Sequence, residues 1–386
     1  MTPGARVAAA IEILDQIDAG QPAEQALTRW ARASRFAGSK DRAAVRDHVF
    51  DVLRHWRSDA VRGGGQTGRA RMIGRLRGQE MDPDTLFTGD GHAPARLSDA
   101  ERGAGAPPTS IGDRWDLPEW LVPQFEQSLG QDAARTALAL TARAPVTLRV
   151  NLVKSTREGA REALARDGIH TVENPRAHTA LTVREGARRV RNAQPYLSGE
   201  VDIQDAASQA AVAAHMGPGR ALDLCAGGGG KALALAAQGW SVTASDIDAD
   251  RMRDLPARAA RGGHKIRVCP TEALSDAGAY DLVFVDAPCS GSGTWRRAPH
   301  AKWVLSPDQL AALVATQRDI LASAARHVAP GGTLAYATCS VLQCENEAQV
   351  AAFLEAQPGF AKAHEQKWSV DDWGDGFFTA HLTREV

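Results

Sequence analysis

Cysteine is scarce in this sequence, and long apolar runs are absent from it. The 386 residues include five cysteines, and none belongs to a CxxC pair. This pattern excludes a disulfide framework and a zinc site, and it is typical of free thiols in a reducing cytosol. No run approaches the roughly 18 apolar residues of a membrane helix, and the acids Glu12, Asp15 and Asp18 would interrupt a secretion signal. We therefore expect a cytoplasmic monomer without membrane association or bound metal.

Length and charge distribution indicate several domains and a first half suited to a polyanion. A chain of 386 residues is too long for one ordinary domain, so we expect two or three. The net charge is −1, yet residues 29–77 contain 13 lysines or arginines against four acids, and residues 143–191 contain 11 against five. Such stretches indicate nucleic-acid binding. They also occur as solvated faces of arginine-rich helices, so charge alone leaves both interpretations open.

Hydrophobic periodicity predicts a helical first part. Helices are expected at 5–19, 22–34, 40–57 and 115–142, where apolar residues recur at helical spacing. The glycines at 63–65 should end the third helix. Residues 80–112 are rich in Gly, Pro and Asp and should form short helical turns at best.

From Pro145 onward the pattern changes to that of an α/β protein. VTLRVNLV reads as a strand, 156–167 as a helix, and further strands complete a small α/β module. After Ala206, alanine-rich helices alternate with the strand-like segments ALDLC, SVTASD, KIRVC, DLVFVD and GTLAYAT. This alternation predicts a parallel, doubly wound sheet.

A glycine loop follows the first of these strands and is a candidate cofactor site. Gly227, Gly228, Gly229 and Gly230 stand between a strand and a helix, where backbone can approach a ligand closely. About twenty residues on, the next strand ends at Asp246, whose carboxylate would suit the hydroxyls of a ribose. The pattern does not match a P-loop. A nicotinamide site and a tight turn without a ligand remain open at this point.

Two cysteines follow strands of the same sheet. Cys289 lies in DAPCSG after DLVFV, and Cys339 lies in TCS after GTLAYA. Because ligands bind beyond the carboxyl ends of parallel strands, both thiols are expected at the edge that holds the glycine loop. Cysteine most often serves as a small buried apolar residue, and we favour that role for the side chains of Cys225, Cys269 and Cys344.

Together these segments resemble the Sun/nucleolar-protein family of RNA (cytosine-5) methyltransferases. ALDLCAGGGGK is similar to the family's cofactor loop, DAPCSGSGTWRRAPHAKW to its proline–cysteine motif, and YATCSVLQCENE to its threonine–cysteine–serine motif. GEVDIQDAASQAAV at 199–212 and DGFFTAHLTR at 375–384 resemble the beginning and the closing strand of its catalytic domain, and 144–156 extends the resemblance upstream.

The resemblance implies a cofactor, a substrate and residue roles. It implies a Rossmann-like domain that binds S-adenosyl-L-methionine and methylates carbon 5 of a cytosine in RNA. Cys339 would be the nucleophile, and Cys289 would assist breakdown of the covalent adduct. Cofactor contacts would fall on Cys225, Ala226, Gly227, Gly228, Gly229, Gly230, Lys231, Asp246 and Asp286.

The chemistry explains the need for a thiol. Carbon 5 of cytosine is a poor nucleophile, and thiolate addition at carbon 6 turns the ring into an enamine-like species that attacks a methyl sulfonium. A base then removes the proton from carbon 5, and the thiolate leaves. Asp286 can hydrogen-bond the ring nitrogen on which charge develops.

The sequence departs from the family pattern at two places. The family loop reads Ala-Pro-Gly-Gly-Lys, whereas Gly227 and Gly228 replace the Ala-Pro pair here. An aspartate near the adenine follows the third strand in the family, and here Thr271 or Glu272 would have to substitute for it.

The N-terminal part resembles the NusB-like RNA-binding domain of the bacterial branch that modifies small-subunit ribosomal RNA, through Arg35–Arg42 and LRHW. We expect a helical RNA-binding domain at 1–130, a small α/β RNA-recognition module at 131–200, and a methyltransferase domain at 201–386. The expected substrate is 16S ribosomal RNA. Transfer RNA, a non-catalytic ribosome-assembly role and a nicotinamide oxidoreductase are the alternatives.

Overall fold

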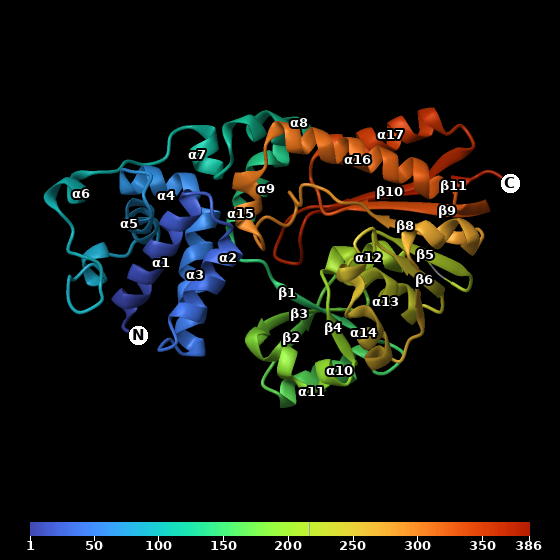
Figure 1. Ribbon diagram of the computed structural model, residues 1–386, viewed down its shortest axis with the longest axis horizontal. Coiled ribbons are helices and arrows are strands. Elements are labelled where there is room, and N and C mark those ends of the chain that lie inside the picture. Colours follow the sequence, from blue (N-terminus) through green and yellow to red (C-terminus); the bar gives the residue numbers. More distant parts are fainter. Residues whose placement is uncertain (216) are drawn as a thin grey trace. The chain divides into compact units, whose positions relative to one another are not determined.

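The chain folds as two compact units, and the computed structural model describes residues 1–215 and 217–386. The first unit consists of Met1–Arg143 and Trp295–Val304, and the second of Ala144–Thr294 and Leu305–Val386. Figure 1 shows helices in the first unit and two sheets with flanking helices in the second. In the described part of the chain, no helix has both the length and the hydropathy needed to cross a membrane.

The first unit, called the helical unit below, packs its helices about an apolar core. They are α1 (Pro3–Asp18), α2 (Ala23–Ala33), α3 (Ser39–Arg54), α4 (Trp56–Gly63), α5 (Gly68–Gly78), α6 (Asp99–Gly103), α7 (Ile111–Trp115), α8 (Val122–Leu129), α9 (Ala133–Thr141) and α15 (Pro299–Val304). The Thr2 hydroxyl caps α1, and Val7, Leu14 and Ile17 bury one face of it. The helices expected at 5–19 and 22–34 are confirmed, and 80–112 contains only short helical segments.

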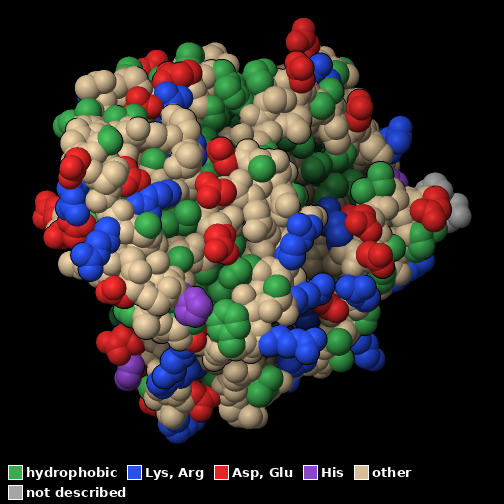
Figure 2. All heavy atoms as spheres, turned by 60° about the vertical axis from the view of Figure 1, so that its left-hand side comes forward, with side chains coloured by type: hydrophobic (Ala, Val, Ile, Leu, Met, Phe, Trp, Pro, Cys, Tyr) green, Lys and Arg blue, Asp and Glu red, His purple; other side chains and the backbone are tan. Residues whose placement is uncertain are grey.

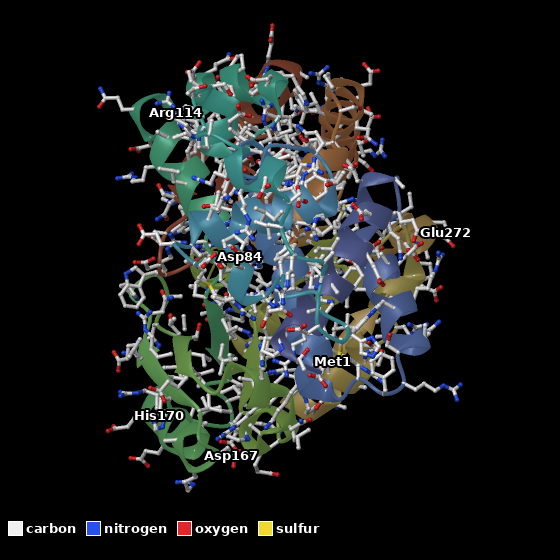
Figure 3. All side chains as sticks on the ribbon, turned by 90° about the vertical axis from the view of Figure 1, so that its left-hand side faces the viewer. Met1, Asp84, Arg114, Asp167, His170 and Glu272 are labelled. Carbon is white, nitrogen blue, oxygen red and sulfur yellow. The ribbon has the colours of Figure 1, made fainter. Side chains whose placement is uncertain are left out.

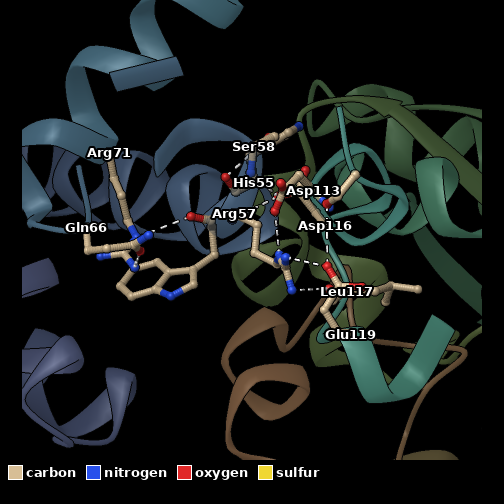
Figure 4. Close-up of polar contacts among 11 residues, drawn as sticks. His55, Arg57, Ser58, Gln66, Arg71, Asp113, Asp116, Leu117 and Glu119 are labelled. Atoms are coloured by element: carbon tan, nitrogen blue, oxygen red, sulfur yellow. Dashed lines mark hydrogen bonds and ion pairs between the residues drawn. The ribbon is translucent and has the colours of Figure 1, made fainter. Parts of the chain in front are cut away.

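Two expected helices are divided in the structure. α3 ends at Arg54 and α4 follows after His55, so the glycines end α4, where Gly64 has a φ of 73°. The helix expected at 115–142 is broken at Asp116 and Gly130, which have φ values of 49° and 54°. The Asp116 carboxylate accepts hydrogen bonds from the amides of Arg57 and Ser58, which stabilises the first break (Figure 4). Hydrophobic periodicity alone does not reveal such side-chain contacts.

The segment Trp295–Val304 follows the loop that carries Cys289, yet it packs within the helical unit. The Trp295 ring is 1% exposed and stacks on Phe125 with ring centroids 6.0 Å apart. Arg54 Nε donates to the Arg296 carbonyl at 2.9 Å, and Trp303 Nε1 donates to the Leu53 carbonyl at 2.7 Å. The helical unit therefore covers a segment that belongs in sequence to the proline–cysteine motif.

The second unit begins with a small antiparallel sheet in the order β2-β3-β1-β4. Its strands and helices are β1 (Val146–Val150), α10 (Arg157–Arg166), β2 (His170–Glu173), β3 (Ala180–Glu185), α11 (Gln194–Leu197) and β4 (Val201–Ile203). Asn151 Nδ2 donates to the Gly262 carbonyl at 2.8 Å, and Arg258 pairs with Asp202 at 2.6 Å. These contacts join the small sheet to α14 (Leu255–Gly262), a helix that packs on the large sheet.

The large sheet has seven strands in the order β10-β11-β9-β8-β5-β6-β7. The strands are β5 (Arg220–Leu224), β6 (Ser241–Ser245), β7 (Ile266–Val268), β8 (Tyr280–Asp286), β9 (Val328–Thr338), β10 (Phe360–Trp368) and β11 (Phe377–Arg384). β7, β6, β5, β8 and β9 run parallel, whereas β11 pairs antiparallel with both β9 and β10. The expected Rossmann-like α/β fold is confirmed.

Helices cover both faces of this sheet (Figure 1). They are α12 (Ala206–Ala213), α13 (Gly230–Ala237), α14 (Leu255–Gly262), α16 (Pro307–Ala325) and α17 (Glu347–Ala356). Leu235 and Leu255 belong to the core on one face, and Leu321 and Phe353 to the core on the other. The edge strand β10 was not expected, because its side chains are mostly exposed and polar and show no apolar alternation.

Candidate active site

The candidate site lies at the carboxyl ends of four adjacent parallel strands, β9, β8, β5 and β6. β5 leads into the glycine loop and β6 into Asp246, while β8 ends at Asp286 and β9 leads into Cys339. Strand order therefore brings the expected site residues to one edge of the sheet.

The backbone of the glycine loop has positive φ values at positions that favour glycine. Gly227 and Gly229 have φ values of 52° and 76°, and Cys225 also has a positive φ, of 64°. A Cβ atom built on Gly229 would lie 2.3 Å from Leu255 Cδ1. Gly229 is therefore required both by its backbone conformation and by the close approach of α14.

Asp246 is buried beneath this loop and organises it. Its side chain accepts hydrogen bonds from the amides of Gly227 at 2.8 Å and Asp248 at 3.0 Å. Arg251 pairs with it at 3.3 Å, but the Arg251 side chain is 54% exposed and can exchange this contact for a ligand. A buried carboxylate beside close-approach glycines fits the ribose hydroxyls of S-adenosylmethionine.

Lys231 and Asp286 connect the cofactor loop to the proline–cysteine loop. Lys231 Nζ donates to Asp286 Oδ2 at 2.6 Å. Burial opposes the positive charge, but the carboxylates of Asp286 and Asp223 outweigh it, and the pKa of Lys231 is raised. Lys231 therefore remains a charged donor to the Asp286 carboxyl.

Asp223 is a buried carboxyl that the sequence reasoning missed. It lies in β5, is fully buried, and its carboxyl oxygens accept no hydrogen bond of normal geometry within the described residues. Burial raises its pKa to about 7, and Asp286 adds to the increase while Lys231 opposes it. An acid inside the apolar segment ALDLC was the signal that could have identified it.

The two candidate thiols lie side by side. Cys289 Sγ and Cys339 Sγ are 3.5 Å apart, and both cysteines are free and partly buried. The contact with Cys339, together with burial, raises the pKa of Cys289 well above its ordinary value. Two thiols this close can act on the same small ligand.

A second residue that the sequence reasoning missed, Glu345, joins the two cysteine loops. Its buried carboxylate accepts hydrogen bonds from the amide and hydroxyl of Ser290, at 2.8 and 2.5 Å, and from the hydroxyl of Ser340, at 2.5 Å. Gln317 Nε2 donates to it at 3.1 Å. Ser290 and Ser340 each follow one of the cysteines, so this carboxylate couples the positions of both thiols. The segment CENE contains the residue, but its contacts depend on the tertiary structure.

The two residues considered as substitutes for the adenine-side aspartate differ in position. Thr271 Oγ1 hydrogen-bonds Ser245 Oγ at 3.2 Å, next to Asp246. Glu272 is exposed and points away from the body of the protein in Figure 3. Thr271 is therefore the better placed of the two.

Most basic side chains of the stretch at 29–77 form ion pairs or hydrogen bonds within the helical unit. Arg46, Arg54, Arg57, Arg62, Arg69, Arg71 and Arg75 pair with acids, and Arg77 donates to backbone carbonyls. Figure 4 shows Arg57 bound to Asp113 and Glu119. The charge count therefore overstated the number of cations available to a polyanion. On the face shown in Figure 2, basic and acidic side chains are interspersed, with basic ones gathered toward the lower right.

Comparison with known families gives two matches. A family model described as 16S rRNA methyltransferase RsmB/F matches residues 214–383. A model described as a Methyltr_RsmF/B-like, ferredoxin-like domain matches residues 117–190, which include three strands of the small sheet.

Curated relatives agree with these matches. The ribosomal RNA small subunit methyltransferase B of Xylella fastidiosa strain 9a5c is 34% identical over 291 residues, covering 70% of this chain and 69% of the relative. The protein of the same name from Salmonella arizonae is 33% identical over 285 residues, covering 69% and 66%. The chain thus spans about two thirds of the length of these relatives.

Solved structures support the fold. The crystal structure of PH0851 superimposes with a TM-score of 0.77 at 23% identity and covers 99% of both chains. The structure of NSun6 from Pyrococcus horikoshii has a TM-score of 0.62 at 18% identity and covers 69% of this chain and 98% of its own.

Proposed function

Since this chain belongs to the RsmB/F family of 16S rRNA methyltransferases, we propose that it forms 5-methylcytosine in small-subunit ribosomal RNA. The observation that carries the proposal is the pair of thiols, 3.5 Å apart, at the sheet edge that also holds the glycine loop and Asp246. S-adenosylmethionine, when bound at that loop, supplies an electrophilic methyl group.

Cys339 is the proposed nucleophile. Its thiolate adds to carbon 6 of the cytosine, and the ring electrons move toward carbon 5, which then takes the methyl group. Asp286 is proposed to face the ring nitrogen that becomes more basic on addition. The 2.6 Å contact with Lys231 holds the Asp286 carboxyl in place and provides a proton donor beside it.

Cys289 is proposed to take part in release. The hydrogen bond to Cys339 is the largest cause of its raised pKa, and Cys339 loses its thiol proton and its thiolate charge when it bonds to the RNA. Adduct formation should therefore lower the pKa of Cys289, so that a larger fraction of it is thiolate and able to accept the proton from carbon 5. Once that proton is removed, the bond from carbon 6 to Cys339 breaks, and the thiolate departs.

We assign the other parts of the chain to holding RNA. Residues 1–130 are proposed to bind RNA, and the small sheet region, 131–200, to recognise it, with 201–386 performing the reaction. S-adenosylmethionine contacts are assigned to Cys225–Lys231, Asp246 and Asp286.

The division of labour between the thiols can be tested by two variants. Cys339→Ala should abolish methylation and covalent complex formation. Cys289→Ala should still attack and transfer the methyl group but remain bonded to RNA, giving a slow band on denaturing electrophoresis. A trapped band with Cys339→Ala instead would reverse the roles, and full activity in both variants would refute the mechanism.

Bisulfite sequencing of total RNA from a deletion strain identifies the substrate. One cytosine of 16S RNA that resists bisulfite conversion in the parent strain should be converted in the deletion strain. Loss of a site in transfer RNA instead would redirect the proposal to that substrate, and no lost site would favour a non-catalytic assembly role.

A further inference from the structure

An open groove in the helical unit is lined by small, aromatic and charged side chains. It encloses about 840 Å³ and lies between α1, α2 and the loop at 90–92. Its floor is made of small side chains, Ala5, Ala8 and Ala9 from α1 and Ala33 from α2. Small side chains on both helices leave room for a flat ring to approach the backbone closely. Met1, labelled in Figure 3, precedes the first turn of α1 and also lines this groove.

Aromatic rings form part of the groove's wall. Phe36 lines it and is 77% exposed, the largest exposed fraction of any aromatic residue in the described chain. Trp30 lines it as well and rests on the core of the helical unit. An exposed phenylalanine beside a supported indole leaves two apolar ring surfaces available for stacking.

The cations around the groove differ from the arginines that follow them at 46–75, which pair with acids. Arg29 lines it, and Arg32, Arg35, Lys40 and Arg42 lie nearby in sequence; all five are exposed. Within the described residues none of them forms an ion pair, whereas neighbouring Arg46 is paired with Glu24. Unpaired cations beside stacking surfaces match a phosphodiester backbone with an unstacked base.

We propose that this groove binds an unpaired nucleotide of the RNA substrate, with its base against Phe36 and Trp30 and its phosphates near Arg29. The proposal rests on the proposed function and adds a second contact point, distant in sequence from the thiols. Glu12 and Asp90, which also line the groove, provide acceptors for the exocyclic amino group of a base.

The test uses the full-length protein and a fluorescent single-stranded RNA of about ten nucleotides, followed by anisotropy at several salt concentrations. Phe36→Ala should weaken binding about tenfold. It should leave unchanged the salt slope, which is the slope of the logarithm of the binding constant against the logarithm of salt concentration, since the lost contact is uncharged. Arg29→Ala should make this negative slope shallower by about 0.7, the value for one phosphate contact on a single strand. Phe36→Trp should restore affinity, and Ala8→Leu, which raises the floor, should weaken it.

Met81→Ala and Arg114→Ala are matched controls, because both side chains are exposed in the same unit and lie outside the groove. Both controls should bind like the unaltered protein. Unchanged affinity in Phe36→Ala would overturn the proposal and leave a protein partner as the occupant. Equal competition by duplex RNA would also overturn it. If the groove does not bind RNA, methylation at saturating RNA and the phenotypes of the two cysteine variants would still be as proposed. This outcome is therefore distinguishable from failure of the proposed function.

Discussion

At the scale of single residues, Asp246 is the carboxylate that the proposed cofactor site depends on most. It is buried, it holds the Gly227 amide, and its contact with the exposed Arg251 is exchangeable. Asp246→Ala should weaken S-adenosylmethionine binding by roughly 1–3 kcal/mol, because charge-assisted hydrogen bonds are lost. Calorimetry measures this directly, with Asp248→Ala as the exposed control. Unaltered affinity in Asp246→Ala would remove Asp246 from the cofactor site, and binding of a nicotinamide dinucleotide instead would replace the cofactor itself.

A variant of Glu345 tests whether this one buried carboxylate holds the two cysteine loops in place. Glu345→Gln keeps the size of the side chain but turns an –NH₂ group toward hydroxyl and amide donors. One or more donors would be left unsatisfied, at a cost of about 1–3 kcal/mol. We expect kcat to fall and the KM for RNA to stay constant, since the loops move but the RNA surfaces do not. Glu355→Gln, at an exposed position of α17, should behave like the unaltered protein. A pure rise in KM would show that Glu345 acts on RNA binding.

At the scale of elements, the turn from β5 into α13 depends on backbone conformation. Gly229 combines a φ of 76° with a close approach to Leu255, whereas a Cβ on Gly230 would meet its nearest atom at 3.9 Å. Gly229→Ala should lower the free energy of unfolding by about 1–3 kcal/mol and weaken cofactor binding, while Gly230→Ala should be tolerated. Urea denaturation of the two variants makes the comparison. Equal stability would mean that the loop can rearrange around a methyl group.

The β11 strand and the end of α12 bring together histidines that should make the protein sensitive to acid. His381 and His215 have ring centroids 4.1 Å apart, and burial lowers their pKa values to about 4 and about 3. Because the unfolded chain binds protons at a higher pH than the folded one, stability should fall as pH drops from about 6.5 toward 4. His381→Phe should reduce the loss between pH 7 and pH 5 by about 2 kcal/mol. An unchanged pH dependence would assign the acid sensitivity to other groups.

At the scale of the whole molecule, the helical unit buries a segment that belongs in sequence to the proline–cysteine motif. It buries Trp295 and Lys302, each 1% exposed, and burial lowers the pKa of Lys302 to about 8. Deleting residues 1–130 should therefore uncover this segment and reduce methylation even at saturating RNA. Trypsin should then cut rapidly after Arg296, which is buried in the full chain and should be spared there. Phe125→Ala, which removes only the ring stacked on Trp295, should give a milder form of both effects. Full activity of the truncated chain would limit the helical unit to RNA binding.

The sequence by itself determined much of this protein, because the relevant signals are local. Alternating apolar strands and alanine-rich helices specify the parallel sheet, since each pattern reflects contacts within one element. The residues that follow each strand were placed at one edge, since parallel strands present their carboxyl ends together. The breaks at His55 and Asp116 escaped this reasoning, because periodicity continues across them.

Only the tertiary structure decided which distant segments meet. It placed β8 beside β9 and so brought Cys289 within 3.5 Å of Cys339. It set Glu345 between the loops of both cysteines, and it packed Trp295–Val304 within the helical unit. It also used most of the arginines at 29–77 in internal ion pairs. These arrangements depend on packing and electrostatics between residues far apart in the chain, and no local spacing encodes them.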